Sequence, residues 1–217
     1  MDCIAHRGFA GVNPENTLPA VRAAAAGADC IEVDVRRCGS GELVVIHDEE
    51  VDRVTDGTGR VGELPLERLR DLEVLGSGTG VPTLAEVVEA ASVPLNVELK
   101  ERGLVVDALD LADDAGVDAF YSAFDPAVVE AVRERGAPAA PLFFESPEGA
   151  LDFARRLDCV AVHPQLGLCD DAFLARAADA GLAVNAWTVR SREAGRALAD
   201  AGVDGLIADA PGYCPDR

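Results

Sequence analysis

The feature that most constrains the fold is an alternation of short β-rich segments with amphipathic, alanine-rich segments through nearly all of the 217 residues. Such alternation indicates parallel strands joined by right-handed crossovers. Eight units in a chain of this length favour a (β/α)8 TIM barrel over an open doubly wound sheet. The segments with strand character are residues 3–6, 30–36, 94–100, 118–123, 139–144, 159–163, 182–189 and 204–208. The segments with helical character are residues 15–26, 83–91, 104–115, 126–135, 147–156, 170–180 and 192–201.

The residues at the segment ends agree with this assignment. Asp125 and Ser146 each stand before a proline, so a capping side chain precedes an N1 proline at the start of a helix. A Rossmann fold is disfavoured because a His-Arg-Gly tripeptide at 6–8, and no GxGxxG motif, follows the first strand. The glycine-rich run 76–80 lacks the GK[ST] ending of a phosphate loop. We interpret this run as a flexible linker.

We expect a single catalytic TIM-barrel domain over residues 1–217. One segment departs from the alternation, because an extra apolar run at 43–46 is followed by His47-Asp48 and then by a turn-rich stretch. The predicted barrel therefore carries a short insertion after the second strand, at roughly residues 49–81. Such an insertion would lie on the side of the βα loops, where the active sites of these barrels are found.

The charge composition restricts the partners of the chain. Its 39 acidic and 19 basic side chains give a formal net charge of −20, whereas a nucleic-acid-binding protein needs a basic surface. The same charge argues against stable association with anionic membranes. Lys100 is the only lysine, and this acidic, lysine-poor composition resembles that of proteins from salt-loving cells.

The start of the chain and its cysteines predict a location. No secretory signal and no membrane-spanning apolar run is recognisable. The cysteines show no CxxC pair and no spacing typical of a metal site. We therefore expect a cytoplasmic protein in which the six cysteines are reduced, structural thiols. The sequence does not predict an oligomeric state.

Three carboxylates are candidates for metal binding. Glu32 and Asp34 lie two residues apart on the second strand and so point to one face, and Glu98 ends the third strand. Three carboxylates that converge in a barrel mouth cannot all remain ionised without compensation. A hard divalent cation with oxygen ligands supplies it, and Mg²⁺ or Ca²⁺ suits such ligands better than zinc. The structural alternative is that these acids only pair with neighbouring arginines and Lys100.

Two of the three histidines are candidates for catalysis. His6 and His47 each end an apolar segment that faces the predicted mouth, and each stands next to a charged residue. A pair of histidines with pKa values near neutrality can act as general acid and general base. His163, between a valine and a proline, is expected to be structural.

Two cations and one aromatic residue complete the candidate site. Arg7 and Lys100 are positive groups beside the carboxylates, where an anionic ligand such as a phosphate is expected. Trp187 is the only tryptophan, and it is either a half-buried barrel residue or an apolar wall for a substrate.

The order of these motifs resembles that of the glycerophosphodiester phosphodiesterase family, over nearly the whole chain. The matching segments are His6-Arg7-Gly8, Pro14-Glu15-Asn16-Thr17, the run 27–35, Val44-Val45-Ile46-His47-Asp48, Arg53-Val54-Thr55, Pro82-Thr83-Leu84, Val97-Glu98-Leu99-Lys100, Asn185-Ala186-Trp187-Thr188-Val189 and Gly205-Leu206-Ile207-Ala208-Asp209. The chain departs from the family pattern at 38–41 and at Ala123, where a second serine is common. These departures affect the expected substrate preference and leave the expected chemistry intact.

The resemblance implies a role for each candidate residue. His6 and His47 match the acid-base pair, Glu32, Asp34 and Glu98 match the ligands of a divalent metal, and Arg7, Lys100 and Trp187 match the contacts to the phosphate and substrate. It implies metal-dependent hydrolysis of glycerophosphodiesters to glycerol 3-phosphate and an alcohol, through a cyclic phosphate, in lipid and glycerol metabolism.

Three other readings remain open on the sequence. The first is a phospholipase C-like phosphodiesterase that acts on lysolipids or phosphoinositides. The second is a barrel that binds phosphate esters without turnover. A metal-dependent isomerase or aldolase is the third, although it would usually use a Schiff-base lysine, and the carboxylates around Lys100 would keep that lysine protonated.

Overall fold

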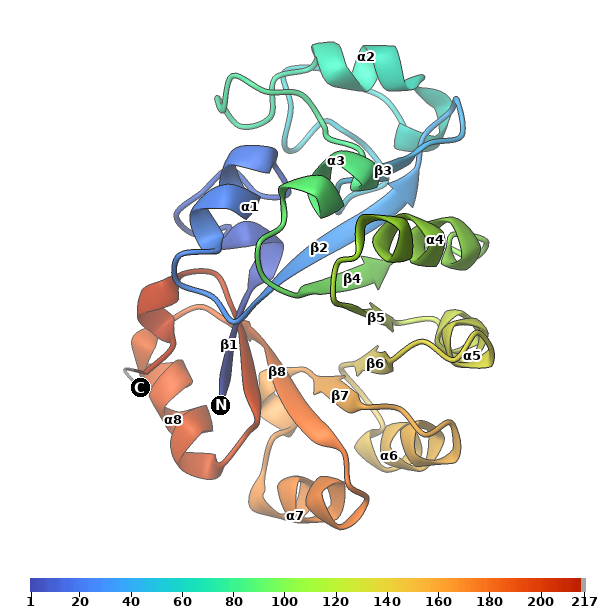
Figure 1. Ribbon diagram of the computed structural model, residues 1–217. Helices are drawn as coiled ribbons and strands as arrows, with labels where there is room; N and C mark the ends of the chain where they lie inside the picture. Colours follow the sequence, from blue (N-terminus) through green and yellow to red (C-terminus); the bar gives the residue numbers. More distant parts are fainter. Residues whose placement is uncertain (216–217) are drawn as a thin grey trace.

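The computed structural model describes residues 1–215 and shows eight parallel strands closed into a barrel with helices around it (Figure 1). The barrel closes because β1 (Asp2–Ala5) pairs in parallel with both β2 (Cys30–Arg37) and β9 (Gly205–Ala208). The other parallel strands are β4 (Leu95–Leu99), β5 (Ala119–Ala123), β6 (Ala139–Phe143), β7 (Ala161–Pro164) and β8 (Ala183–Val189). The prediction of a TIM barrel is confirmed.

Of the two expected capping side chains, Asp125 caps α5 by accepting a hydrogen bond from the Ala127 amide, whereas Ser146 precedes α6 without a side-chain hydrogen bond to it. α1 begins at Leu18, three residues later than predicted, because the Thr17 side chain accepts a hydrogen bond from the Ala20 amide as its N-cap. A capping box between Thr83 and Glu86 starts α3. The helices are α1 (Leu18–Ala24), α3 (Leu84–Ala90), α4 (Val105–Ala115), α5 (Pro126–Glu134), α6 (Pro147–Arg156), α7 (Asp171–Asp179) and α8 (Arg192–Ala201).

In the segment after β2, the apolar run 43–46 noted in the sequence forms a short strand, and a helix that the sequence did not predict follows it. β3 (Leu43–Val45) pairs antiparallel with the end of β2, and α2 (Leu66–Asp71) lies beyond it at the top of Figure 1. A separate apolar cluster packs beneath this segment, and it includes Val51, Leu69 and Val74. The insertion is therefore a packed unit beside the mouth of the barrel.

The expectation of six reduced thiols was wrong for two cysteines. Cys3 and Cys214 form a disulfide across a sequence separation of 211 residues. The pairing is possible because β1 lies beside β9, and the short 3-10 helix Pro211–Tyr213 after β9 brings Cys214 back to the start of the chain. No local spacing reveals such a pair. The other four cysteines are free, and three of them are buried.

None of the helices within residues 1–215 is both long enough and apolar enough to cross a membrane.

Candidate active site

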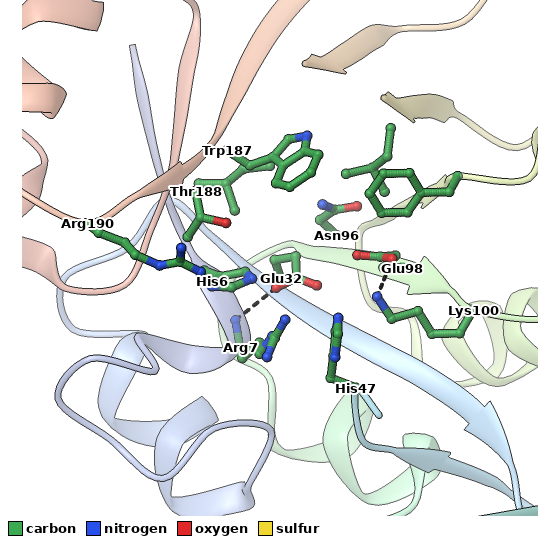
Figure 2. Close-up of a pocket in the computed structure, with 13 residues that line it drawn as sticks. His6, Arg7, Glu32, His47, Asn96, Glu98, Lys100, Trp187, Thr188 and Arg190 are labelled. Atoms are coloured by element: carbon green, nitrogen blue, oxygen red, sulfur yellow. Dashed lines mark hydrogen bonds and ion pairs between the residues drawn. The ribbon is translucent and has the colours of Figure 1, made fainter. Parts of the chain in front are cut away.

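The carboxyl ends of the strands surround a cavity of about 150 Å³ (Figure 2). All of the predicted site residues except Asp34 line this cavity, and Asp34 is fully buried on β2 beside them. Asn96, Phe124, Leu142, Thr188, Arg190 and Ile207 complete the lining. The structure therefore brings together residues that span the sequence from position 6 to position 207.

The register of two neighbouring strands gathers the three carboxylates. β2 and β4 are parallel, with Glu32 opposite Asn96 and Asp34 opposite Glu98. Because side chains alternate between the two faces of a strand, the three acids point to the barrel interior together. One oxygen of each carboxylate lies within 4.8 Å of the others, and all three residues are buried.

The donor set fits a hard divalent cation. Glu32 Oε1 is buried and has no hydrogen-bond partner among residues 1–215, which is costly for a carboxylate unless a ligand satisfies it. Three carboxylate oxygens within reach of one another are typical ligands of Mg²⁺ or Ca²⁺. Among the described residues 1–215, Glu32, Asp34 and Glu98 are thus the group that could hold the ion.

The pKa values of Glu32 and Glu98 also indicate that these two acids lack enough positive charge nearby to ionise readily. Burial and the charges of Asp34 and Glu98 raise the pKa of Glu32 well above its usual value. Burial, followed by the charge of Asp34, raises the pKa of Glu98 to about 7. Burial also opposes ionisation of Asp34, but Lys100 and Arg7 outweigh it and hold the pKa of Asp34 low. A bound cation would favour the ionised form of all three acids.

The two predicted phosphate-binding cations lie against these carboxylates. Lys100 Nζ is 2.9 Å from Asp34 Oδ1 and also bonds Glu98 Oε1. Arg7 donates its backbone N–H to Glu32 at 2.8 Å, and its Nε lies 3.1 Å from Asp34 Oδ2. Burial lowers the pKa of Lys100, but the negative charges of Asp34 and Glu98 outweigh burial and raise this pKa above its usual value. The lysine therefore remains charged.

A tight turn after β1 explains the His-Arg-Gly tripeptide. Gly8 has φ +75°, and a Cβ at this position would lie 2.8 Å from the Cβ of Ala20 in α1. Arg7 also has a left-handed backbone, with φ 51°. Only glycine fits this close approach without a clash, and the turn aims His6 and Arg7 at the cavity.

Each of the two candidate catalytic histidines is bound by a carboxylate. His6 Nδ1 lies 2.6 Å from Asp209 Oδ1, at the end of β9. His47 Nδ1 lies 2.6 Å from Asp48 Oδ1. Both histidines line the cavity, and the ring nitrogen left for a ligand in each is Nε2. Burial lowers the pKa of His47, and the positive charges of Lys100 and Arg7 lower it further.

The aromatic side chain of Trp187, which lines the cavity, is held in place by a hydrogen bond and by a ring contact. Trp187 donates its indole N–H to the His163 carbonyl at 2.7 Å, and Phe124 packs edge-on against Trp187 with ring centroids 5.5 Å apart. His163 itself is fully buried, with its Nε2 3.1 Å from Asn185 Nδ2. The structural role expected for His163 agrees with this position.

His163 gives the stability of the fold a specific pH dependence. Burial lowers its pKa to about 3, whereas the unfolded chain has the ordinary histidine value of about 6.5. The unfolded state therefore binds one more proton between these values, and stability falls as the pH drops below 6.5. We expect His163→Gln to reduce the slope of unfolding free energy against pH, measured by urea unfolding from pH 6.5 to 5.0, by roughly 1 kcal/mol per pH unit. Equal slopes in both proteins would contradict this prediction.

The sequence argument assigned no role to several residues of the site. Asp209 and Arg190 follow the last two strands, and the contacts of Asp209 with His6 and of Arg190 with Asp209 cannot be read locally. Glu15 bonds Arg7 at 2.9 Å, and Asn16 bonds Asp34 at 2.8 Å. The motif Pro14-Glu15-Asn16-Thr17 was the available signal for the last two residues.

Comparisons with known proteins agree with this geometry. The model of the Glycerophosphoryl diester phosphodiesterase family matches residues 6–213. A glycerophosphodiester phosphodiesterase from Caldanaerobacter subterraneus subsp. tengcongensis is 31% identical, over 96% of this chain and 93% of its own. Among solved structures, an Oleispira antarctica phosphodiesterase in complex with the product sn-glycerol-3-phosphate superposes with a TM-score of 0.87 at 27% identity, over 98% of this chain and 94% of that one.

The fold is shared even where sequence similarity is lower. A structure from Agrobacterium tumefaciens superposes with a TM-score of 0.90 at 21% identity, over 97% of this chain and 94% of that one. The family match covers every predicted site residue, from His6 to Trp187. The chain therefore belongs to the glycerophosphodiester phosphodiesterase family and is a phosphoric diester hydrolase.

Proposed function

We propose that this protein hydrolyses glycerophosphodiesters to glycerol 3-phosphate and an alcohol by two-histidine acid-base catalysis at a divalent-metal site. The observation that carries the proposal is the meeting, in one cavity, of two histidines with a buried group of three carboxylates. The relative with bound sn-glycerol-3-phosphate supports the choice of substrate class.

The residues around the carboxylates would bind and orient the phosphodiester. Glu32, Asp34 and Glu98 would hold the cation, which when bound supplies Lewis acidity and neutralises phosphate charge. Arg7 and Lys100 would add positive charge on the same side of the cavity. Trp187 would pack against the apolar surface of the substrate and exclude water.

The histidines would move the protons. In this proposal His6 Nε2 accepts the proton of the glycerol 2-hydroxyl as that oxygen attacks phosphorus, and His47 Nε2 protonates the departing alcohol. The product of this first step is a cyclic phosphate. Water then opens the ring with the two roles reversed, so that both histidines return to their starting protonation states.

The metal site can be tested separately from turnover. Glu32→Gln keeps the shape of the side chain and removes its charge, so we expect its affinity for Mg²⁺ and Ca²⁺ to fall by about 10²-fold or more in calorimetric titrations. Glu67→Gln, on an exposed helix of the insertion, is the matched control and should bind like the unaltered protein. Equal affinities for Glu32→Gln and Glu67→Gln would remove Glu32 from the metal site.

The bond that is broken distinguishes this function from a phospholipase C-like reaction. Phosphorus NMR of a reaction with glycerophosphocholine should show glycerol 3-phosphate, with a cyclic glycerophosphate as a transient signal. Formation of phosphocholine would place cleavage on the other side of phosphorus. Binding without any new phosphorus signal would support a barrel that holds phosphate esters without turnover.

A further inference from the structure

The two candidate catalytic histidines are held by the same three-part arrangement, although their partners come from different parts of the chain. In each case the histidine Nδ1 meets one carboxylate oxygen at 2.6 Å, and an arginine Nε donates to the other oxygen of that carboxylate. The first arrangement is His6, Asp209 and Arg190. The second is His47, Asp48 and Arg53.

We propose that Asp48 and Asp209 are positioning residues that keep the proton of each neutral catalytic histidine on Nδ1, and that Arg53 and Arg190 lock the orientation of these carboxylates. The proposal rests on the proposed function, because it concerns the same two histidines. It goes further in assigning the protonated nitrogen, and in explaining why an arginine lies behind each carboxylate.

The chemistry of the carboxylate fixes the proton. An ionised carboxylate only accepts hydrogen bonds, so a neutral imidazole 2.6 Å away must donate from Nδ1. Its Nε2 is then an acceptor facing the cavity, as a general base requires. A protonated imidazole in the same position presents Nε2–H to the cavity, as a general acid requires.

Arg53 constrains its carboxylate partner more strongly than Arg190 does. Its Nε lies 2.5 Å from Asp48 Oδ2, and its two terminal nitrogens bond Glu15 at 3.0 and 2.7 Å. Glu15 in turn bonds Arg7 at 2.9 Å. Arg53 therefore cannot swing away from Asp48 without breaking its contacts to Glu15. Arg190 is 72% exposed and bonds Asp209 at 3.0 Å, so it constrains its carboxylate less strongly.

This arrangement predicts which histidine nitrogen carries the proton when the aspartate is replaced by asparagine. In Asp48→Asn, Arg53 still requires an acceptor, so the amide oxygen turns to Arg53 and the amide NH₂ faces His47 Nδ1. The neutral ring must then carry its proton on Nε2, which faces the cavity. A nitrogen-15 NMR spectrum of histidine-labelled protein reports the tautomer directly, and the chain has only three histidines.

The experiment compares Asp48→Asn, Arg53→Ala and the double variant by this spectrum and by steady-state kinetics. We expect the neutral His47 to carry its proton on Nδ1 in the unaltered protein and in Arg53→Ala, and on Nε2 in Asp48→Asn. Asp48 does not line the cavity, so Asp48→Asn should lower kcat by about 10²-fold or more with little change in KM. In the double variant the asparagine can turn its oxygen back to His47. Adding Arg53→Ala to Asp48→Asn should therefore raise kcat, whereas Arg53→Ala alone should not raise the kcat of the unaltered protein.

Matched controls keep the outcome decisive. Asp125→Asn alters a carboxylate that Arg102 Nε also approaches at 2.5 Å, but with no histidine beside it, so no histidine signal should change. Asp209→Asn repeats the test on His6. It should shift His6 only partly to the Nε2 tautomer, because Arg190 constrains residue 209 less strongly than Arg53 constrains residue 48. This variant replaces Asp48→Asn in the test if Asp48→Asn does not fold.

Two results would overturn the proposal. The first is an Nδ1 proton retained in Asp48→Asn, and the second is a loss of kcat on Arg53→Ala by the same factor in both backgrounds. Failure of the proposed function is a separate outcome, because the tautomers can be read in a protein that hydrolyses no glycerophosphodiester.

Discussion

Replacing either His6 or His47 by alanine is expected to lower kcat on a glycerophosphodiester by about 10²–10⁴-fold, the usual contribution of one general acid or base. Both imidazoles line the cavity beside the carboxylates, and each is oriented through Nδ1. Neither side chain belongs to the group of three carboxylates that could hold the ion. Each variant should therefore retain its affinity for Mg²⁺ or Ca²⁺ while losing turnover.

A substrate with an activated leaving group separates the two roles. A glycerophosphodiester of 4-nitrophenol releases a stable anion and needs little protonation of the leaving oxygen. We expect His47→Ala to recover most of its lost rate on this substrate, whereas His6→Ala should remain impaired because the attacking hydroxyl still needs a base. Recovery of His6→Ala alone would reverse the assignment, and near-normal turnover of either folded variant on glycerophosphocholine would remove that histidine from the mechanism.

Removing the disulfide is expected to produce the largest loss of stability. Cys3 and Cys214 close a loop of more than 200 residues, and the chain-entropy relation gives roughly 5 kcal/mol for a loop of this length. This is a large part of the 5–15 kcal/mol that stabilises a typical domain. We expect the variant with both cysteines changed to serine to unfold at a much lower urea concentration than the unaltered protein. Dithiothreitol should lower the unfolding midpoint of the unaltered protein to that of the variant.

The remaining thiols supply the control for this prediction. Cys169→Ser alters a free, partly exposed cysteine and should unfold at the same urea concentration as the unaltered protein. Titration of the unfolded protein should find four thiols without reductant and six with it. Six thiols without reductant, or an unfolding midpoint that dithiothreitol does not change, would contradict the predicted contribution of the disulfide.

Most of the barrel could be predicted because its signals are local. Each βα unit carries its own apolar strand, amphipathic helix and capping residues, such as Thr17 before α1. α2 lacked such signals, and the only signal for β3 was the apolar run 43–46. β3 has three residues and depends on pairing with β2, and α2 has six residues, one buried leucine and no side-chain hydrogen bond at its N-cap. Both elements are too short to be stable alone, so packing within the insertion contributes to their stability.

The site was predictable where residues share a strand and unpredictable where distant strands meet. The spacing of two between Glu32 and Asp34 was enough to place both on one face, and the register of β2 with β4 then brings Glu98 to them. The contact of His6 with Asp209 spans 203 residues, and the disulfide spans 211. Both follow from barrel closure between β1 and β9, which no short segment encodes.

The central claim is tested most directly by the release of glycerol 3-phosphate from glycerophosphocholine in a coupled assay, with and without EDTA. The account predicts steady release in the presence of Mg²⁺ or Ca²⁺, its loss on addition of EDTA, and its return when excess divalent cation is added. Release that continues unchanged in EDTA, or no release from any glycerophosphodiester with either ion present, would contradict it.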